Sequence, residues 1–326
     1  MVIWEQYVGP ADEWDRYVAA LTGGFYQTYG WGEVRRVSGW QPLRLLAYRG
    51  GQIIAAASVL VKTKLGFAVC WVPGGPIGDL ELLEFDFLPA VARAIGIRWI
   101  YCRLSLLRPD QGDETGWFKN VGWRRPSTTL SSGVTMSYSL VGGESERLQK
   151  TSGNWRHNLR RSTRYSLRIE HWENPDPKAI AALYREMESL KSIPIQHSAA
   201  ELTTIFDQCR EHVVVYRCLD DSGHLLAIRA AGLCGATALD LLAAAGGKAR
   251  KVYASHATLW ALLDHCSRLG LSEYDLGGVD IINNKGVFDF KHGTGATTIE
   301  YLGEWERSTA PGLCQAVNWL LARRWA

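Results

Sequence analysis

The chain has 326 residues, of which 47% are hydrophobic and 21% are charged, and its formal net charge is only +3. The longest strongly apolar run, Ile53–Val61, is too short for a membrane-spanning helix of about 20 residues, so stable membrane insertion is not expected. The small net charge gives the whole chain no general electrostatic preference for nucleic acid. Seven scattered cysteines without a CxxC pair argue against a disulfide framework and a zinc site, and the N-terminus lacks an export signal, so we expect a cytoplasmic protein.

The first half of the chain predicts two helices, an antiparallel strand meander, a further helix and further strands. The helices are predicted over residues 11–24, 29–40 and 85–96, and the strands over residues 42–75 (turning at Gly50–Gly51), 97–107 and 128–140. The second half repeats this order. Its helices are predicted over residues 144–169 (interrupted near Ser152–Gly153), 177–192, 198–212, 255–270 and from Pro311, and its strands over residues 213–246, 272–280 and 298–306.

This repetition predicts two domains, residues 1–143 and residues 144–326, divided near Val141–Gly143. The expected fold class is mixed α/β (α+β) with mostly antiparallel sheets. Neither a GxGxxG dinucleotide fingerprint nor a GxxxxGK[ST] phosphate loop is present, and no cofactor is predicted.

The segment "VFDFKHGTGA" places a lysine between aromatic residues and a glycine-containing turn. Alternation predicts a strand with Val287, Asp289 and Lys291 on one face. Two interpretations stay open. Lys291 forms a surface pair with Asp289, or it stands beside the Gly293–Gly295 turn, where a ligand can approach the backbone, and stabilises a phosphate or an oxyanion.

A second feature is the segment Lys150–Arg168, which contains six lysines and arginines, one histidine and no acid. Helical spacing puts Arg156, Arg160 and Arg164 on one face, with Arg161 beside them. Such a face either points into solvent or binds a polyanion such as tRNA.

Three smaller features could also bind ligands. Arg229 interrupts an apolar strand, where it either pairs with Asp240 across the hairpin or forms a buried anion site. Arg35 and Arg36 follow Trp31 by about one helical turn. Among the histidines, His292 beside Lys291 is the candidate to watch. No GxSxG, HExxH or Cys/His pattern is present, so the composition favours catalysis by positioning and electrostatics between two bound substrates.

Three segments resemble the FemABX family of aminoacyl-tRNA-dependent peptidyltransferases. They are "FYQTYGWGEVRRVSGW", "LQKTSGNWRHNLRRSTRYSLRIE" and, most specifically, "VYASHATLW" through "YDLGGVD" to "GVFDFKHGTGATTIEYLGEWE". The resemblance spans nearly the whole chain and implies two tandem domains that are GNAT-like (similar to acyl-CoA N-acyltransferases). It implies transfer of an amino acid from aminoacyl-tRNA to an amine of a peptide acceptor, either a muropeptide precursor or a peptide natural product.

The resemblance also implies roles for particular residues. Lys291 would lie at the transfer centre, Arg35 and less directly Arg36 would contact the acceptor, and Lys191 and Tyr253 would line the substrate site. Candidates to accept the proton of the amine are Asp280, Asp289, Glu304 or a phosphate of the substrate.

The chain departs from the family pattern in three places. Only "SIPIQH" separates two helices where some members carry a coiled-coil arm, so an arm-less form is expected. Thr294 stands where an aromatic residue is common, and Lys191 where arginine is common.

Two alternatives to tRNA-dependent transfer stay open. The first is an acyl-CoA-dependent N-acyltransferase on the same fold. Its usual [RQ]xxGx[GA] pyrophosphate loop fits "AAGGKARKVYASHA" poorly. The second is a non-catalytic module that binds a peptidoglycan precursor or RNA.

Overall fold

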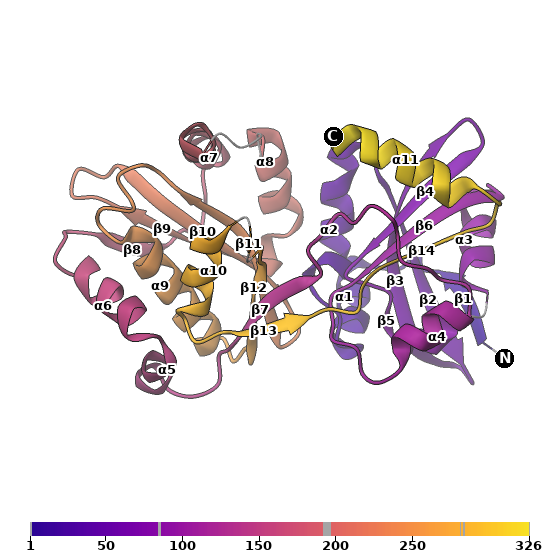
Figure 1. The fold of residues 1–326 in the computed structure, drawn as a ribbon, viewed down its shortest axis with the longest axis horizontal. Helices are drawn as coiled ribbons and strands as arrows, with labels where there is room; N and C mark the ends of the chain where they lie inside the picture. Colours follow the sequence, from indigo (N-terminus) through magenta and orange to yellow (C-terminus); the bar gives the residue numbers. More distant parts are fainter. Residues whose placement is uncertain (1, 84–85, 192–196, 281, 283, 326) are drawn as a thin grey trace. The chain divides into compact units, whose positions relative to one another are not determined.

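The computed structural model describes residues 2–83, 86–191, 197–280, 282 and 284–325 (Figure 1). The chain forms two compact units, called here unit 1 (Met1–Val134 with Ile299–Ala326) and unit 2 (Thr135–Thr298). Each unit is built on one mixed sheet in which most neighbouring strands are antiparallel, as predicted. No helix within the described ranges is long and apolar enough to cross a membrane.

The sheet of unit 1 has the order β1-β2-β3-β4-β6-β14, with the short β5 paired to β3. Its strands are β1 (Val2–Gln6), β2 (Gln41–Arg49), β3 (Gln52–Lys64), β4 (Phe67–Pro73), β5 (Ile77–Gly78), β6 (Trp99–Leu106) and β14 (Gly303–Ser308). The predicted β2–β3 hairpin is confirmed. Gly50 and Gly51 both have positive φ, as a tight two-residue hairpin turn requires.

The helices of unit 1 pack apolar side chains on this sheet. They are α1 (Ala11–Ala20), α2 (Tyr29–Val34), α3 (Phe87–Ile95), α4 (Glu114–Asn120) and α11 (Leu313–Trp325), with short 3-10 turns η1 (Phe25–Gln27), η2 (Arg35–Ser38) and η3 (Leu80–Leu83). Phe87 of α3 packs edge-on against Trp4 of β1 at 5.0 Å between ring centroids, and both side chains are almost fully buried. The core of unit 1 therefore joins the first strand to α3, about 80 residues later in the chain.

The sheet of unit 2 has the order β13-β7-β12-β11-β10-β9-β8. Its strands are β7 (Val134–Ser139), β8 (Arg168–His171), β9 (Val213–Leu219), β10 (Leu225–Cys234), β11 (Thr237–Ala245), β12 (Glu273–Gly278) and β13 (Thr297–Glu300). Its helices are α5 (Glu144–Lys150), α6 (Gly153–Ser162), α7 (Pro177–Lys191), α8 (Ala199–Gln208), α9 (Ala254–Arg268) and α10 (Lys285–His292), with the 3-10 turn η4 (Arg210–His212).

Alternate residues of β10 face the two sides of this sheet. Ile228 packs with α7, whereas its neighbour Ala227 packs with Ala254 of α9. This alternation follows from the period of two in a strand and puts α7 and α9 on opposite faces. The predicted break in the basic segment is also confirmed, because Ser152 separates α5 from α6 and caps α6 by accepting from Trp155 N–H.

The C-terminal segment differs from the sequence analysis, which placed the division at residues 143/144 and gave all later residues to the second domain. The predicted strand over residues 298–306 is instead two strands, and the second of them, β14, pairs antiparallel with β6 of unit 1. Trp305 is fully buried there and stacks on Phe118 at 4.7 Å. Residues 303–308 belong to unit 1 because β14 pairs with the distant strand β6 and because Trp305 is buried there. The local sequence contains no signal for either contact.

The expected strand at "VFDFK" is wrong, because these residues form most of helix α10. A short apolar run does not distinguish a buried strand from one face of a helix. In the helix Asp289 lies one turn after Lys285 and pairs with that lysine at 2.7 Å. The predicted surface pair between Asp289 and Lys291 is therefore also wrong.

Candidate functional site

Lys291 in the last turn of α10 is buried, with 8% of its surface exposed. Its Nζ donates hydrogen bonds to the carbonyl oxygens of Gly277, at 3.0 Å, and Gly278, at 2.8 Å, at the end of β12. Gly277 has a φ of +78°, a conformation that glycine adopts without strain. An ammonium group has three N–H donors, so these two carbonyls fix Lys291 and leave one donor for a ligand.

A buried ion pair lies in the same part of unit 2. Arg229 of β10 pairs with Asp240 of β11, as one of the two sequence interpretations expected. Tyr274 of β12 donates a hydrogen bond to the other carboxylate oxygen of Asp240 at 3.1 Å. Burial raises the pKa of Asp240, and the positive charges of Arg229 and Lys291 oppose that rise.

Two cations and two carboxylates act on one another around Lys291. Burial lowers the pKa of Lys291, and Arg229 lowers it further, whereas Asp240 and Asp275 act in the opposite direction. Asp275 is engaged locally, since it accepts hydrogen bonds from Thr135 Oγ1 and Gly277 N–H. The four formal charges therefore balance, and the Lys291 ammonium, with one N–H not used by Gly277 or Gly278, is the group that could stabilise negative charge developing beside it.

Aromatic rings surround His256 in this unit, and the sequence analysis missed this histidine. Its ring lies 5.0 Å from Phe290, 5.2 Å from Trp155 and 6.1 Å from Tyr253, measured between centroids. The only sequence signal was its spacing, one helical turn after Tyr253. His292 was the predicted candidate, but it is exposed and stacks on Phe288 at 5.5 Å.

Burial, with Arg229 adding to it, lowers the pKa of His256 from 6.5 to about 4. Below about pH 6.5 the unfolded chain therefore binds a proton that the folded protein takes up only near pH 4, so the contribution of His256 to stability falls as the pH falls through this window. We expect a His256→Phe variant to lack this loss. Urea unfolding from pH 7 to pH 4.5 measures the free energy of unfolding of both proteins. As the pH falls, the wild type should lose stability relative to the variant. If the difference in free energy of unfolding between the two proteins is the same at every pH, His256 does not have a lowered pKa in the folded protein.

The basic residues of α6 have different roles. Arg156 donates to the carbonyl oxygens of Leu148 and Gln149, both at 3.1 Å, and so caps the end of α5. The guanidinium of Arg161 lies 4.7 Å from the ring centroid of Tyr253, which adopts a left-handed conformation immediately before α9. Arg160 and Arg164 are exposed and have no ion-pair partner in the described part of the chain.

The predicted acceptor-binding arginines lie in η2 of unit 1. Arg35 is partly buried, and its guanidinium lies 5.6 Å from the ring centroid of Trp31. Arg36 is exposed and binds Glu33 at 2.5 Å and Gln41 at 2.7 Å. Arg35 is thus held on an aromatic platform, whereas the donors of Arg36 are partly used within the unit.

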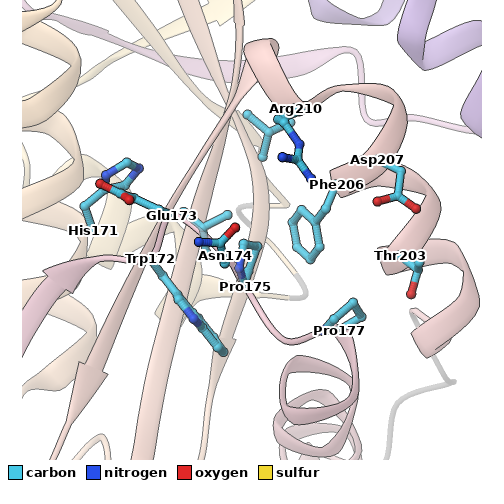
Figure 2. A pocket seen from close by; sticks show the side chains of 12 residues that line it. His171, Trp172, Glu173, Asn174, Pro175, Pro177, Thr203, Phe206, Asp207 and Arg210 are labelled. Atoms are coloured by element: carbon cyan, nitrogen blue, oxygen red, sulfur yellow. The ribbon is translucent and has the colours of Figure 1, made fainter.

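A pocket of unit 2 lies apart from these groups, at the β8 edge of the sheet (Figure 2). None of the predicted site residues lines it. Within the described residues, no cluster of three or more His, Cys, Asp or Glu side chains could hold a metal ion.

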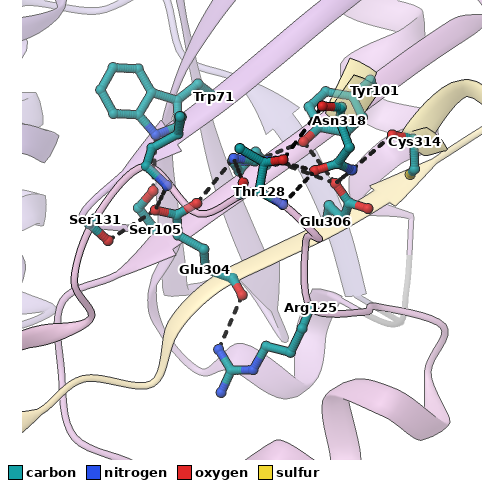
Figure 3. A network of polar contacts seen from close by, with 12 residues as sticks. Trp71, Tyr101, Ser105, Arg125, Thr128, Ser131, Glu304, Glu306, Cys314 and Asn318 are labelled. Atoms are coloured by element: carbon teal, nitrogen blue, oxygen red, sulfur yellow. Dashed lines mark hydrogen bonds and ion pairs between the residues drawn. The ribbon is translucent and has the colours of Figure 1, made fainter. Parts of the chain in front are cut away.

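The remaining candidates from the sequence are not gathered around Lys291. Glu304 belongs to unit 1, where it is buried and accepts from Arg103, Leu130 N–H and Ser131 within a polar network (Figure 3). Asp280 is exposed just beyond β12 and accepts from Ile282 N–H at 3.1 Å. Lys191 ends α7, but its side chain lies outside the described residues.

Thr294, the residue that departs from the family pattern, is fully buried. Its hydroxyl donates to the carbonyl oxygen of Lys291 at 2.6 Å and accepts from Ala296 N–H at 3.3 Å. Thr294 thus closes the end of α10 and supports the backbone of Lys291.

Comparison with known proteins agrees with the resemblance seen in the sequence. The sequence model of the FemAB family matches residues 230–320, a range that includes Asp240, Tyr253 and Lys291. The structure of FemX is similar over 97% of this chain and 99% of that chain, with a TM-score of 0.83 and 17% identity. No curated protein matches the sequence.

Two further solved structures share the fold more distantly. A tandem GNAT protein from the clavulanic acid biosynthesis pathway is similar over 95% of this chain and 99% of that chain, with a TM-score of 0.57 and 11% identity. L-PGS from Bacillus licheniformis is similar over 98% of this chain and 97% of that chain, with a TM-score of 0.57 and 12% identity. The family model over residues 230–320 agrees with the predicted resemblance to the FemABX family, and the predicted fold of two GNAT-like domains is confirmed.

Proposed function

We propose that this acyltransferase of FemABX type transfers an amino acid from aminoacyl-tRNA to an amine of a peptide acceptor in the cytoplasm. The observation that carries the proposal is the geometry of Lys291. This buried cation is fixed by two carbonyl oxygens and lies within the segment that matches the FemAB family. A peptidoglycan precursor or a peptide natural product would be the acceptor.

The proposed reaction needs no covalent enzyme intermediate. The acceptor nitrogen attacks the ester carbonyl carbon of the aminoacyl group, a C–N bond forms, and the C–O bond to the tRNA ribose breaks. The amine loses one proton and the ribose hydroxyl gains one, so the exchange balances. Lys291 would stabilise the tetrahedral oxyanion, and the paired Arg229 would add positive potential.

The other site residues would bind the two substrates. Arg35 on its Trp31 platform and Arg36 would contact the acceptor, as would Lys191. Tyr253, whose ring stacks with the guanidinium of Arg161, would orient the aminoacyl end of the tRNA. Asp280 or a substrate phosphate would accept the amine proton. We infer that Asp289 and Glu304 do not, because their carboxylates already bind Lys285 and Arg103.

The direct test is transfer of label. The protein is incubated with a pool of radiolabelled aminoacyl-tRNAs and with candidate amine acceptors, with and without prior RNase treatment. RNase-sensitive transfer of label to the acceptor supports the proposal. Transfer only from acyl-CoA would assign the chain to the acyl-CoA-dependent alternative, which is favoured by the fold shared with a tandem GNAT protein studied in relation to AcCoA. Binding of RNA or precursor without transfer from either donor would indicate a non-catalytic module.

The exposed arginines of α6 provide a separate prediction about tRNA binding. Reversing the charge of Arg160 and Arg164 together (R160E with R164E) should weaken tRNA binding and reduce the slope of log affinity against log salt by about 1.5, the effect of two lost phosphate contacts. Arg156 is left unchanged because its side chain caps α5. The matched control reverses Lys178 and Arg185, two exposed cations of α7. If the two double variants have equal salt slopes, Arg160 and Arg164 do not contact tRNA and simply point into solvent.

A further inference from the structure

The pocket at the edge of the unit 2 sheet has the size of a small-molecule site. Its volume is about 410 Å³, within the roughly 300–1,000 Å³ typical of such sites. It forms where β8 ends and the chain continues to α7, and α8 with η4 closes the other side. Its walls include Trp172, Glu173, Asn174, Phe206, Asp207 and Arg210.

Three charged side chains of this pocket have no ion-pair partner in the described part of the chain. They are the carboxylates of Glu173 and Asp207 and the guanidinium of Arg210. Figure 2 shows the Glu173 carboxylate beside the His171 ring on one side of the pocket, the Asp207 carboxylate on the other side beyond Phe206, and the Arg210 guanidinium directed toward the Phe206 ring. Asp207 lies in the last turn of α8, where the helix dipole adds negative potential. The pocket therefore offers two anionic positions and one cationic position.

The apolar wall of the pocket is held in place by unit 2 itself. Trp172 N–H donates to the carbonyl oxygen of Val215 at 2.8 Å, and the guanidinium of Arg217 lies 4.6 Å from the Trp172 ring centroid. Phe206 and Trp172 both pack against the core between α7 and the sheet. A short methylene chain could rest on these two aromatic side chains without ordering new structure.

We propose that this pocket binds a diamino monocarboxylic acid, the class to which lysine and ornithine belong. Its two ammonium groups match Glu173 and Asp207, its carboxylate matches Arg210, and its methylene chain matches the aromatic wall. A ligand of net charge +1 thus meets a pocket whose three unpaired groups sum to −1. The charge count distinguishes this class from a neutral zwitterion or a simple anion.

The pocket is separate from the Lys291 site. Lys291 binds the end of β12, whereas the pocket lies beyond β8, four strand intervals away in the sheet order. At about 4.8 Å per interval the separation is roughly 19 Å. A free diamino acid bound here would not reach Lys291, so the pocket is a ligand site in addition to the proposed transfer site.

The test is calorimetric titration of the full chain with three probes that differ by one charged group. L-lysine has all three groups, L-norleucine lacks the side-chain ammonium, and L-lysinamide lacks the carboxylate. We expect L-lysine to bind at least about 10-fold more tightly than either analogue, since each lost charge removes a charge-assisted contact. The titration contains no tRNA and no acceptor, so its outcome is independent of the transfer assay.

Variants of the exposed pocket residues make the test specific. R210Q should abolish the preference for lysine over lysinamide, and the double variant E173Q with D207N should abolish the preference for lysine over norleucine. The matched control, R185Q with D221N, changes exposed charges elsewhere in unit 2 and should retain both preferences. The proposal is overturned if lysine does not bind at about 10 mM, if the three probes bind equally, or if the pocket variants behave like the control.

Discussion

Replacement of Lys291 by methionine is expected to lower the turnover of aminoacyl transfer at least about 10-fold. Methionine keeps a side chain of similar length but cannot supply the positive charge or the free N–H donor. Removing one oxyanion contact costs about 10²–10³ in turnover in well-studied enzymes, so 10-fold is a lower bound. The variant should stay folded, because the two carbonyl oxygens that it releases lie at the end of β12, where Gly278 is exposed to water.

The matched control for this variant is Lys285→Met in the same helix. Lys285 is exposed and pairs with Asp289 at 2.7 Å, so its loss should change turnover by less than about 2-fold. Single-turnover rates with saturating aminoacyl-tRNA separate the chemical step from binding. If Lys291→Met and Lys285→Met have the same rate, Lys291 has no role in transfer and its burial is structural.

Replacement of Arg103 by methionine should strongly destabilise unit 1. Arg103 is 2% exposed and binds both Glu304, at 3.1 Å, and Glu306, at 3.5 Å, together with Asn318 of α11. Figure 3 shows how closely the Tyr101, Glu306 and Asn318 side chains gather around this network. Removing the cation leaves two buried carboxylates without their shared partner. Breaking a buried pair in this way costs about 3–5 kcal/mol, a large part of an ordinary domain's stability.

An exposed ion pair in the same unit provides the comparison. Arg93 binds Asp86 at 2.6 Å, but the arginine side chain is 59% exposed, so Arg93→Met should cost only about 0–1 kcal/mol. Urea unfolding of both variants followed by tryptophan fluorescence measures the two losses. Losses of equal size would show that the network around Arg103 contributes no more than a surface pair.

The local sequence was sufficient to predict the parts of this protein that depend on neighbouring residues. Gly50 and Gly51 predicted a hairpin because only their positive φ values allow the tight turn. The break predicted near Ser152–Gly153 lies where the Ser152 hydroxyl caps α6, and the Arg229–Asp240 pair, one of two interpretations, followed from strand geometry across one hairpin. The motif around Lys291 also predicted the resemblance to the FemABX family, because a family pattern is carried by residue order and needs no coordinates.

Tertiary structure alone decided the features that depend on distant segments. The residues around Lys291 form a helix rather than a strand because packing decides the conformation of a short apolar run. Lys291 is buried because the carbonyl oxygens of Gly277 and Gly278, fourteen and thirteen residues earlier, replace water around its ammonium. His256 meets Trp155 and Phe290 only through packing between helices, and β14 joins β6 across about 200 residues. Such contacts have no local signal, because their free energy comes from burying groups that the chain brings together only when it folds.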